Sequence, residues 1–130
     1  MFDLPHNSTS HTIINEFHAL NRVIAAVCHG PAALAYVKLP SGAFLLENTP
    51  VTGFCNTEEE NYGYKDAMPF SLEDALDAAS NGKFVKAKDM YEANVVVSQG
   101  GKLITGQNPA SAEVVGQAIW KELEKEGKSA

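Results

Sequence analysis

Residues 23–31 read Val-Ile-Ala-Ala-Val-Cys-His-Gly-Pro, and this stretch decides the fold. Its first five residues are all apolar and of strand length, which is typical of a parallel strand covered by helices on both faces. Gly30 and Pro31 end the run, and Pro31 suits the first turn of a helix because an N–H there would have no intrahelical acceptor. The stretch predicts a central strand at Val23 to Val27, a tight turn at Cys28 and a helix from about residue 31.

The segments before and after this stretch have weaker patterns. Apolar residues at helical spacing predict a helix over residues 10–20, capped by Ser8 or Thr9. Residues 43–46 and 51–54 flank a turn-like Glu-Asn-Thr-Pro and are expected to be short extended segments. The acidic run at residues 58–60 is expected to be a loop.

The C-terminal half alternates helix and strand signals. Ser71 and Asp74 resemble a capping box that opens a helix. Residues 95–97 and 103–105 are predicted strands, joined through Gly100-Gly101. Asn108 can cap a last helix with Pro109 at its first position. The order helix, strand, helix, strands, helix indicates an α/β layer fold, and a length of 130 residues favours one domain.

The charge pattern excludes several classes of partner. The formal net charge is -6, and the ten Lys and Arg residues are scattered, so we expect no nucleic-acid binding. No segment has the apolar length of a membrane span, and the polar N-terminus lacks the features of a signal peptide. We therefore expect no membrane partner and a cytoplasmic protein, with the nucleus as an alternative location.

The cysteines and histidines indicate thiol chemistry rather than a metal site. The two cysteines, Cys28 and Cys55, are expected to be free thiols because a cytosolic chain of this size needs no disulfide. The four histidines lack metal-ligand spacing, so no metal is expected. Cys55 is interpreted as a small buried residue, with a second oxidisable thiol as the alternative.

Cys28 lies where a strand turns into a helix, and this is a favourable place for a thiolate. Unpaired N–H groups and the helix dipole stabilise negative charge there and can lower a thiol pKa to roughly 3.5–7.5. His29 is a candidate base, and a carboxylate from the acidic loop could fix its tautomer. A buried structural cysteine is the alternative that this placement alone leaves open.

Three blocks of sequence resemble one known family. They are residues 25–34, Ala-Ala-Val-Cys-His-Gly-Pro-Ala-Ala-Leu; residues 51–60, with Val-Thr-Gly-Phe, Asn56 and the glutamate run; and residues 103–111, Leu-Ile-Thr-Gly-Gln-Asn-Pro-Ala-Ser. Together they resemble the DJ/PfpI superfamily, and most closely its heat-shock-protein-like glyoxalase III subgroup. The resemblance implies a flavodoxin-like, class I glutamine-amidotransferase-like three-layer sandwich.

The resemblance also implies an active site and its residues. Cys28 and His29 match the family's nucleophile and histidine, and Glu59 matches the acid, with Glu58 and Glu60 as close rivals. The backbone N–H groups of His29 and Gly30 are the expected oxyanion donors. The implied reaction converts methylglyoxal to D-lactate without glutathione, metal or cofactor.

The resemblance covers only the C-terminal part of the family domain. A strand-borne glutamate and a Gly-His-Gly turn lie upstream in the family, so residues 1–130 are expected to form a single partial domain lacking the N-terminal strands. The expected function is a glyoxalase III of the D-lactate dehydratase type. The alternatives are a stress-response holdase or redox sensor without turnover, and a cysteine hydrolase or deglycase. A homodimer also stays open.

Overall fold

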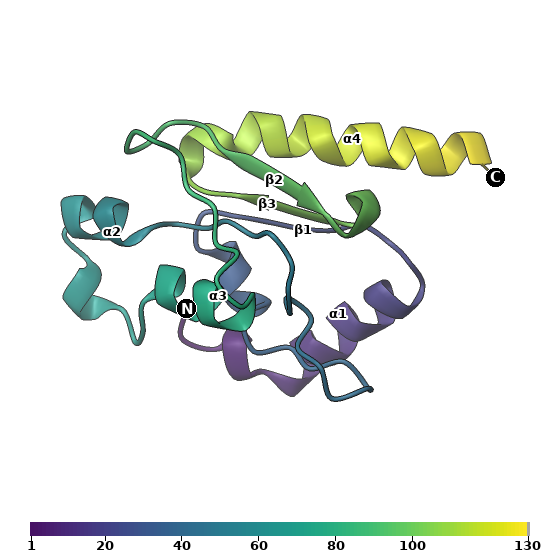
Figure 1. The fold of residues 1–130 in the computed structure, drawn as a ribbon, viewed down its shortest axis with the longest axis horizontal. Coiled ribbons are helices and arrows are strands. Elements are labelled where there is room, and N and C mark those ends of the chain that lie inside the picture. The colour runs from purple at the N-terminus through teal and green to yellow at the C-terminus, as the bar shows by residue number, and fades with distance from the viewer. Residues whose placement is uncertain (130) are drawn as a thin grey trace.

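The computed structural model describes residues 1–129 and places a small sheet between two layers of helices (Figure 1). The strands are β1 (Ile24–Val27), β2 (Val95–Ser98) and β3 (Leu103–Gly106), in the order β1-β3-β2. β1 runs parallel to β3, and β2 runs antiparallel to it. The predicted α/β layer fold is therefore confirmed, with a mixed sheet.

The helices cover both faces of the sheet. Helix α4 lies along one face, and α1 and α3 lie on the other side (Figure 1). The α-helices are α1 (Ser8–Ala19), α2 (Asn56–Tyr62), α3 (Leu72–Ala79) and α4 (Ala112–Ser129). Short 3₁₀ turns are η1 (Leu4–His6), η2 (Gly30–Ala33), η3 (Lys65–Ala67), η4 (Gln99–Gly101) and η5 (Pro109–Ser111).

Strand β1 forms where the apolar run predicts it, one residue shorter, but it is not the central strand. β3 lies between β1 and β2, so β1 is an edge strand of the described sheet and that part of the prediction is wrong. The helix expected from about residue 31 is also wrong, since only the 3₁₀ turn η2 forms there. The chain continues in tight turns, in which Leu34 N–H bonds to Pro31 O and Val37 N–H bonds to Leu34 O.

The two extended segments at residues 43–46 and 51–54 are not strands. Each contributes one isolated bridge, Lys38 with Phe44 and Val51 with Phe84. Their apolar residues are instead buried in the core: Leu45, Leu46, Val51 and Phe54 are each at most 3% exposed. The apolar residues of these segments therefore serve the core from irregular structure and not from strands.

The helix starts follow ordinary capping chemistry. Asn7 caps α1 by accepting the Ser10 N–H, so α1 begins two residues before the expected position and Ser8 and Thr9 are not its cap. Ser71 caps α3 through the Asp74 N–H, as predicted. Asn108 and Pro109 open η5, which leads into α4 as expected.

The main core lies between the sheet and the layer that contains α3 and η2. Its buried apolar residues include Val37, Leu46, Leu76 and Leu103, each 0% exposed. Full burial of one such side chain stabilises the folded state by about 1.5–3 kcal/mol. This packing fixes the position of β1 and β3, and with it the turn that follows β1.

Candidate active site

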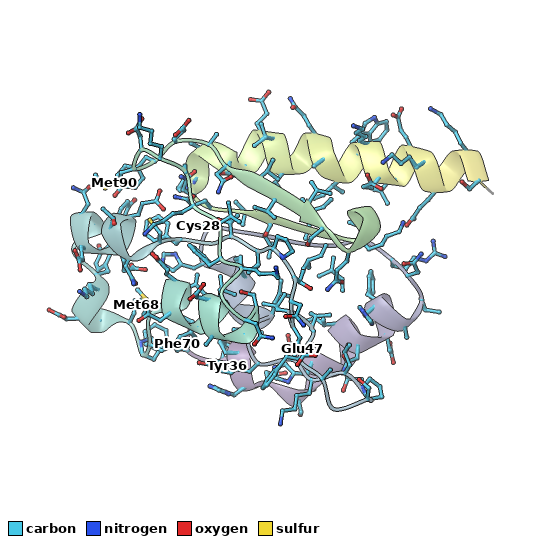
Figure 2. The ribbon with its side chains drawn as sticks, in the orientation of Figure 1. Cys28, Tyr36, Glu47, Met68, Phe70 and Met90 are labelled. Atoms are coloured by element: carbon cyan, nitrogen blue, oxygen red, sulfur yellow. The ribbon has the colours of Figure 1, made fainter. Side chains whose placement is uncertain are left out.

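Cys28 lies directly after β1, on a strained turn at the carboxyl end of the strand (Figure 2). Its φ of 63° is in the left-handed region, which a non-glycine residue adopts only when its surroundings hold it there. The Cys28 N–H donates to Gly106 O (3.0 Å), and the Phe54 N–H donates to Cys28 O (2.8 Å). Both backbone groups are thus fixed by neighbouring segments, as in the nucleophile elbow of hydrolases.

His29 and Glu59 lie beside this thiol. The Cys28 Sγ is 3.5 Å from His29 Nδ1, and His29 Nε2 is 2.6 Å from Glu59 Oε2. The His29 side chain is 32% exposed and that of Glu59 is 10% exposed. The structure therefore brings the three residues named from the family resemblance into one continuous row.

The row fixes the protonation pattern of the imidazole. Glu59 accepts the hydrogen bond from Nε2–H, so the neutral ring keeps its proton on Nε2 and presents the Nδ1 lone pair to the thiol. Nδ1 can then take the Cys28 proton, and Glu59 stabilises the imidazolium that results. The arrangement can generate a thiolate next to a cationic acid.

The resting thiol is not acidic, which corrects the expectation of a lowered pKa. Burial raises the pKa of Cys28 above its usual value, the His29 backbone N–H opposes the rise, and the negative charges of Glu58 and Glu59 add to it. The 3₁₀ turn after Cys28 has four residues and offers little helix dipole. Cys28 is thus protonated at rest, and a base beside it is needed for attack.

The acidic run at residues 58–60 is not a solvated loop. It lies in α2, whose N-cap is Cys55, and the Glu58 carboxylate accepts the Cys55 N–H (3.2 Å). The three glutamates diverge: Glu59 contacts His29, Glu60 pairs with Lys65 at the surface, and Glu58 is 0% exposed. Of the three candidate acids, only Glu59 contacts the imidazole.

A buried polar network around Glu58 was missed from the sequence. Its carboxylate accepts hydrogen bonds from Gln107 Nε2 (2.9 Å), Asn108 Nδ2 (2.8 Å) and the Tyr91 N–H (3.0 Å). Burial alone would raise the pKa of Glu58, but the hydrogen bonds from Gln107, Asn108 and Cys55 outweigh it and lower the pKa. The available signal was a polar Gln-Asn pair directly after the apolar run of β3.

Aromatic rings extend from the imidazole toward the surface. The His29 and Phe54 ring centroids are 4.6 Å apart, and Phe54 is 6.0 Å from Tyr62 and 6.4 Å from Tyr91. Phe54 is 3% exposed, whereas Tyr62 is 60% exposed. The side of the imidazole near Phe54 is therefore shielded from water.

The second thiol is a structural residue. Cys55 is 3% exposed, and burial raises its pKa. Gln107 Nε2 lies 3.8 Å from its Sγ. The interpretation of Cys55 as a small buried residue is confirmed.

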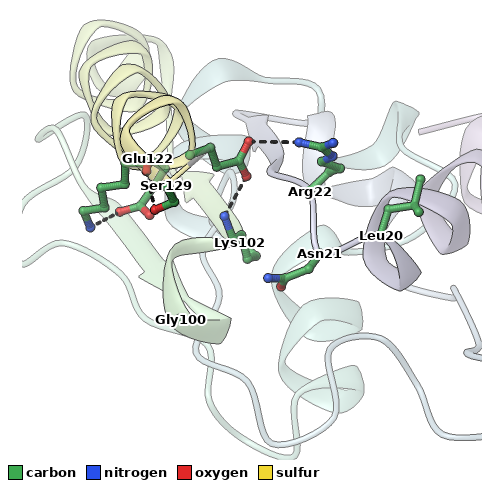
Figure 3. Close-up of a pocket in the computed structure, with 9 residues that line it drawn as sticks. Leu20, Asn21, Arg22, Gly100, Lys102, Glu122 and Ser129 are labelled. Atoms are coloured by element: carbon green, nitrogen blue, oxygen red, sulfur yellow. Dashed lines mark hydrogen bonds and ion pairs between the residues drawn. The ribbon is translucent and has the colours of Figure 1, made fainter.

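A cavity of about 470 Å³ lies at the opposite end of the sheet (Figure 3). Arg22 and Lys102, which precede β1 and β3, line it together with the carboxylates of α4. Glu126 pairs with Lys102 (2.6 Å) and with Arg22 (3.5 Å), and Lys125 pairs with Glu122 (2.6 Å). All of its three cationic and two anionic side chains are engaged in these ion pairs, and neither cysteine lines it.

Within residues 1–129, no group of three or more His, Cys, Asp or Glu side chains is arranged to hold a metal ion. None of the helices up to Ser129 has the length and apolarity that crossing a bilayer requires.

Comparison with known proteins identifies relatives of the chain. No protein-family model matches it. It is 34% identical over 127 residues to the glutathione-independent glyoxalase hsp3101 of Schizosaccharomyces pombe, covering 93% of this chain and 51% of that protein. It is 31% identical to the glutathione-independent glyoxalase HSP31 of Saccharomyces cerevisiae, covering 86% of this chain and 48% of that protein.

Solved structures share the fold. The Rapid Encystment Protein 24 kDa of Francisella tularensis superposes with a TM-score of 0.88 at 40% identity, over 94% of this chain and 52% of that chain. Glyoxalase III of Candida albicans superposes with a TM-score of 0.82 at 24% identity, over 92% of this chain and 51% of that one, and shows the fold alone.

The resemblance seen in the three sequence blocks is therefore confirmed. The chain spans about half the length of the curated relatives it matches. The chain is similar in sequence to proteins named glutathione-independent glyoxalase, and its fold matches those of the solved structures.

Proposed function

We propose that this chain carries the thiol centre of a glutathione-independent glyoxalase, which converts methylglyoxal to D-lactate as a D-lactate dehydratase. The observation that carries the proposal is the row from Cys28 Sγ through the His29 imidazole to Glu59, with separations of 3.5 and 2.6 Å. The relatives named glutathione-independent glyoxalase, such as hsp3101 of Schizosaccharomyces pombe, support the choice of a glyoxalase reaction.

The first step is addition of the thiol to the aldehyde. His29 Nδ1 removes the proton from Cys28 Sγ, and the sulfur bonds to the aldehyde carbon while the carbonyl oxygen takes up a proton, giving a hemithioacetal. Because the resting pKa of Cys28 is raised, the neutral imidazole has to act as the base. Backbone N–H groups of His29 and Gly30 are the proposed donors to the developing oxyanion.

The second step moves hydrogen within the substrate. His29 takes the proton from the former aldehyde carbon and returns one to the neighbouring carbon through an enediol, leaving a thioester of lactate on Cys28. Water then hydrolyses the thioester, which releases lactate and restores the thiol. Glu59 holds the imidazole in one orientation and balances its charge whenever it is protonated.

The test uses the two cysteines as a matched pair. D-lactate formed from methylglyoxal without glutathione is measured for the unmodified chain, Cys28→Ser and Cys55→Ser. We expect product from the unmodified chain and Cys55→Ser, and none above background from Cys28→Ser. Equal product from the two variants, or no product from the unmodified chain, would refute the proposal. Thioester and ester substrates added in parallel detect the hydrolase alternative.

A second candidate function is a holdase that binds unfolded chains. The observation that favours it is an exposed apolar strip beside β1: Ile13 is 51% exposed, Phe17 is 47% and Leu20 is 70%. Such a strip can bind apolar segments without chemistry. If the chain is a holdase, the Cys28→Ala variant should suppress aggregation of a heat-denatured client protein as well as the unmodified chain does. Loss of suppression in Cys28→Ala would exclude this function.

A further inference from the structure

Glu58 is a buried anion to which the mechanism assigns no role. The side chain is 0% exposed, and the hydrogen bonds that lower its pKa keep it ionised at neutral pH. All of its hydrogen-bond donors are neutral groups: the Cys55 and Tyr91 N–H groups and the side chains of Gln107 and Asn108. A buried charge satisfied in this way is costly to place, so its position needs an explanation.

The donors come from three segments that are far apart in sequence. Cys55 begins α2, Tyr91 lies in the loop before β2, and Gln107 and Asn108 follow β3. Each carboxylate oxygen accepts one bond from a backbone N–H and one from a side-chain amide: Oε1 from Cys55 and Gln107, and Oε2 from Tyr91 and Asn108. Glu58 therefore joins the start of α2 to the end of β3 and to the Tyr91 loop.

The Tyr91 loop depends on the same carboxylate. Tyr91 has a φ of 61°, a left-handed conformation that is unfavourable for a tyrosine. Its N–H donates to Glu58 Oε2 (3.0 Å), and its hydroxyl, which carries a single proton to donate, lies within hydrogen-bond distance of Asn61 Oδ1 (3.0 Å) and Glu58 O (3.3 Å). These bonds hold the ring against Phe54, which in turn covers the His29 ring.

Glu59 is the next residue on α2, so the anchoring of Glu58 sets where the Glu59 carboxylate lies. The position of the first turn of α2 is also fixed by the two residues before it. The Phe54 N–H donates to Cys28 O, and the Cys55 N–H donates to the Glu58 carboxylate. We propose that Glu58 is a positioning residue, whose buried hydrogen-bonded carboxylate holds Glu59 against His29 and so keeps Nδ1 directed at the Cys28 thiol. The inference rests on the proposed function only in taking His29 as the base and Glu59 as the carboxylate that orients it.

Two substitutions of Glu58 separate position from charge. In Glu58→Gln the shape is kept, but whichever way the amide turns, its NH₂ group faces two donors. In Glu58→Asp the charge is kept, but the carboxylate is one methylene too short to reach both pairs. Glu60→Gln, on the same helix and in an exposed pair with Lys65, is the control.

The readout is the rate at which iodoacetamide labels Cys28 at pH 7, measured by peptide mass analysis well below each variant's melting temperature. We expect Glu58→Gln, Glu58→Asp and Glu59→Gln each to slow labelling about tenfold, because His29 then takes the thiol proton less efficiently. In the Glu59→Gln background, neither Glu58 substitution should slow labelling further, since residues acting through one another are not additive. Glu60→Gln should label at the unmodified rate.

Other roles for Glu58 give different results. The charges facing Cys28 are those of Glu58 and Glu59, and both raise its pKa. A pure field effect therefore predicts faster labelling in Glu58→Gln and no change in Glu58→Asp. A purely structural role predicts lower melting temperatures with unchanged labelling. Either result, or slowing that persists in the Glu59→Gln background, overturns the proposal. Methylglyoxal is absent from the assay, so failure of the proposed function is detected separately by the D-lactate measurement.

Discussion

The carboxyl ends of β1 and β3 and the outer flank formed by β1 and α1 are built in opposite ways. At the carboxyl ends, Glu58, Gln107 and Asn108 are each at most 1% exposed and satisfy one another through hydrogen bonds. On the flank, α1 has no buried residue, and β1 pairs with β3 on one side only. The comparison shows that buried hydrogen bonds fix the positions of the residues around the thiol, whereas the flank is loosely covered and leaves apolar surface exposed.

The largest difference in stability should appear when the core next to β3 is compared with the flank. Leu103 is 0% exposed, so Leu103→Ala should lower the free energy of unfolding by about 2–5 kcal/mol. Phe17 on α1 is 47% exposed, and Phe17→Ala should change the free energy of unfolding by no more than about 0.5 kcal/mol. Urea denaturation of both variants measures the values, and similar losses would show that the flank is as well packed as the core.

The buried carboxylate should make stability fall in acid. Because the pKa of Glu58 is lowered in the folded state, its contribution is present above its unfolded value and is lost as the pH falls through the folded value. At pH 7 we expect Glu58→Gln to be about 1–3 kcal/mol less stable than the unmodified chain. This difference in stability should narrow as the pH falls below 4.5, the ordinary pKa of a glutamate, and thermal melts at pH 7, 5, 4 and 3 can follow it. A gap independent of pH would contradict an ionised Glu58.

The exposed edge of β1 on the flank should promote self-association of the chain. Natural edge strands usually carry charges that prevent pairing with other chains, but Val23 to Val27 carry none. We therefore expect the chain to self-associate at high concentration, and Ala25→Lys, which places a charge on an exposed position of β1, to reduce this. Sedimentation velocity over a concentration series compares the two. Identical behaviour would indicate that the β1 edge takes no part in association.

The same contrast explains what the sequence could predict. β2, β3, α3 and the start of the last helix follow from local patterns: apolar runs, a glycine turn, and caps at Ser71 and Asn108. The thiol turn also follows locally, since Val27 ends an apolar run and Gly30-Pro31 interrupt it. These elements are decided by neighbours in sequence.

The buried network could not be predicted in this way. Helix α2 was expected to be a loop because three adjacent glutamates suggest solvent exposure, yet Glu58 is buried by partners 33 to 50 residues away. The segments at 43–46 and 51–54 flank a turn-like stretch as strands often do, but they form irregular structure with one isolated bridge each. The rise in the pKa of Cys28 likewise depends on burial and on two carboxylates brought in by α2.

The adjacent carboxylates of α2 give the most direct test of the central claim, that Cys28 acts through His29 and Glu59. The measurement is the initial rate of D-lactate formation from methylglyoxal, without glutathione, for the unmodified chain, Glu59→Gln and Glu60→Gln. Glu59 accepts from His29 Nε2 at 2.6 Å, whereas Glu60 pairs with Lys65 at the surface. We predict a loss of about 10²-fold or more for Glu59→Gln and a change within about twofold for Glu60→Gln. Equal rates for the two variants would contradict the claim.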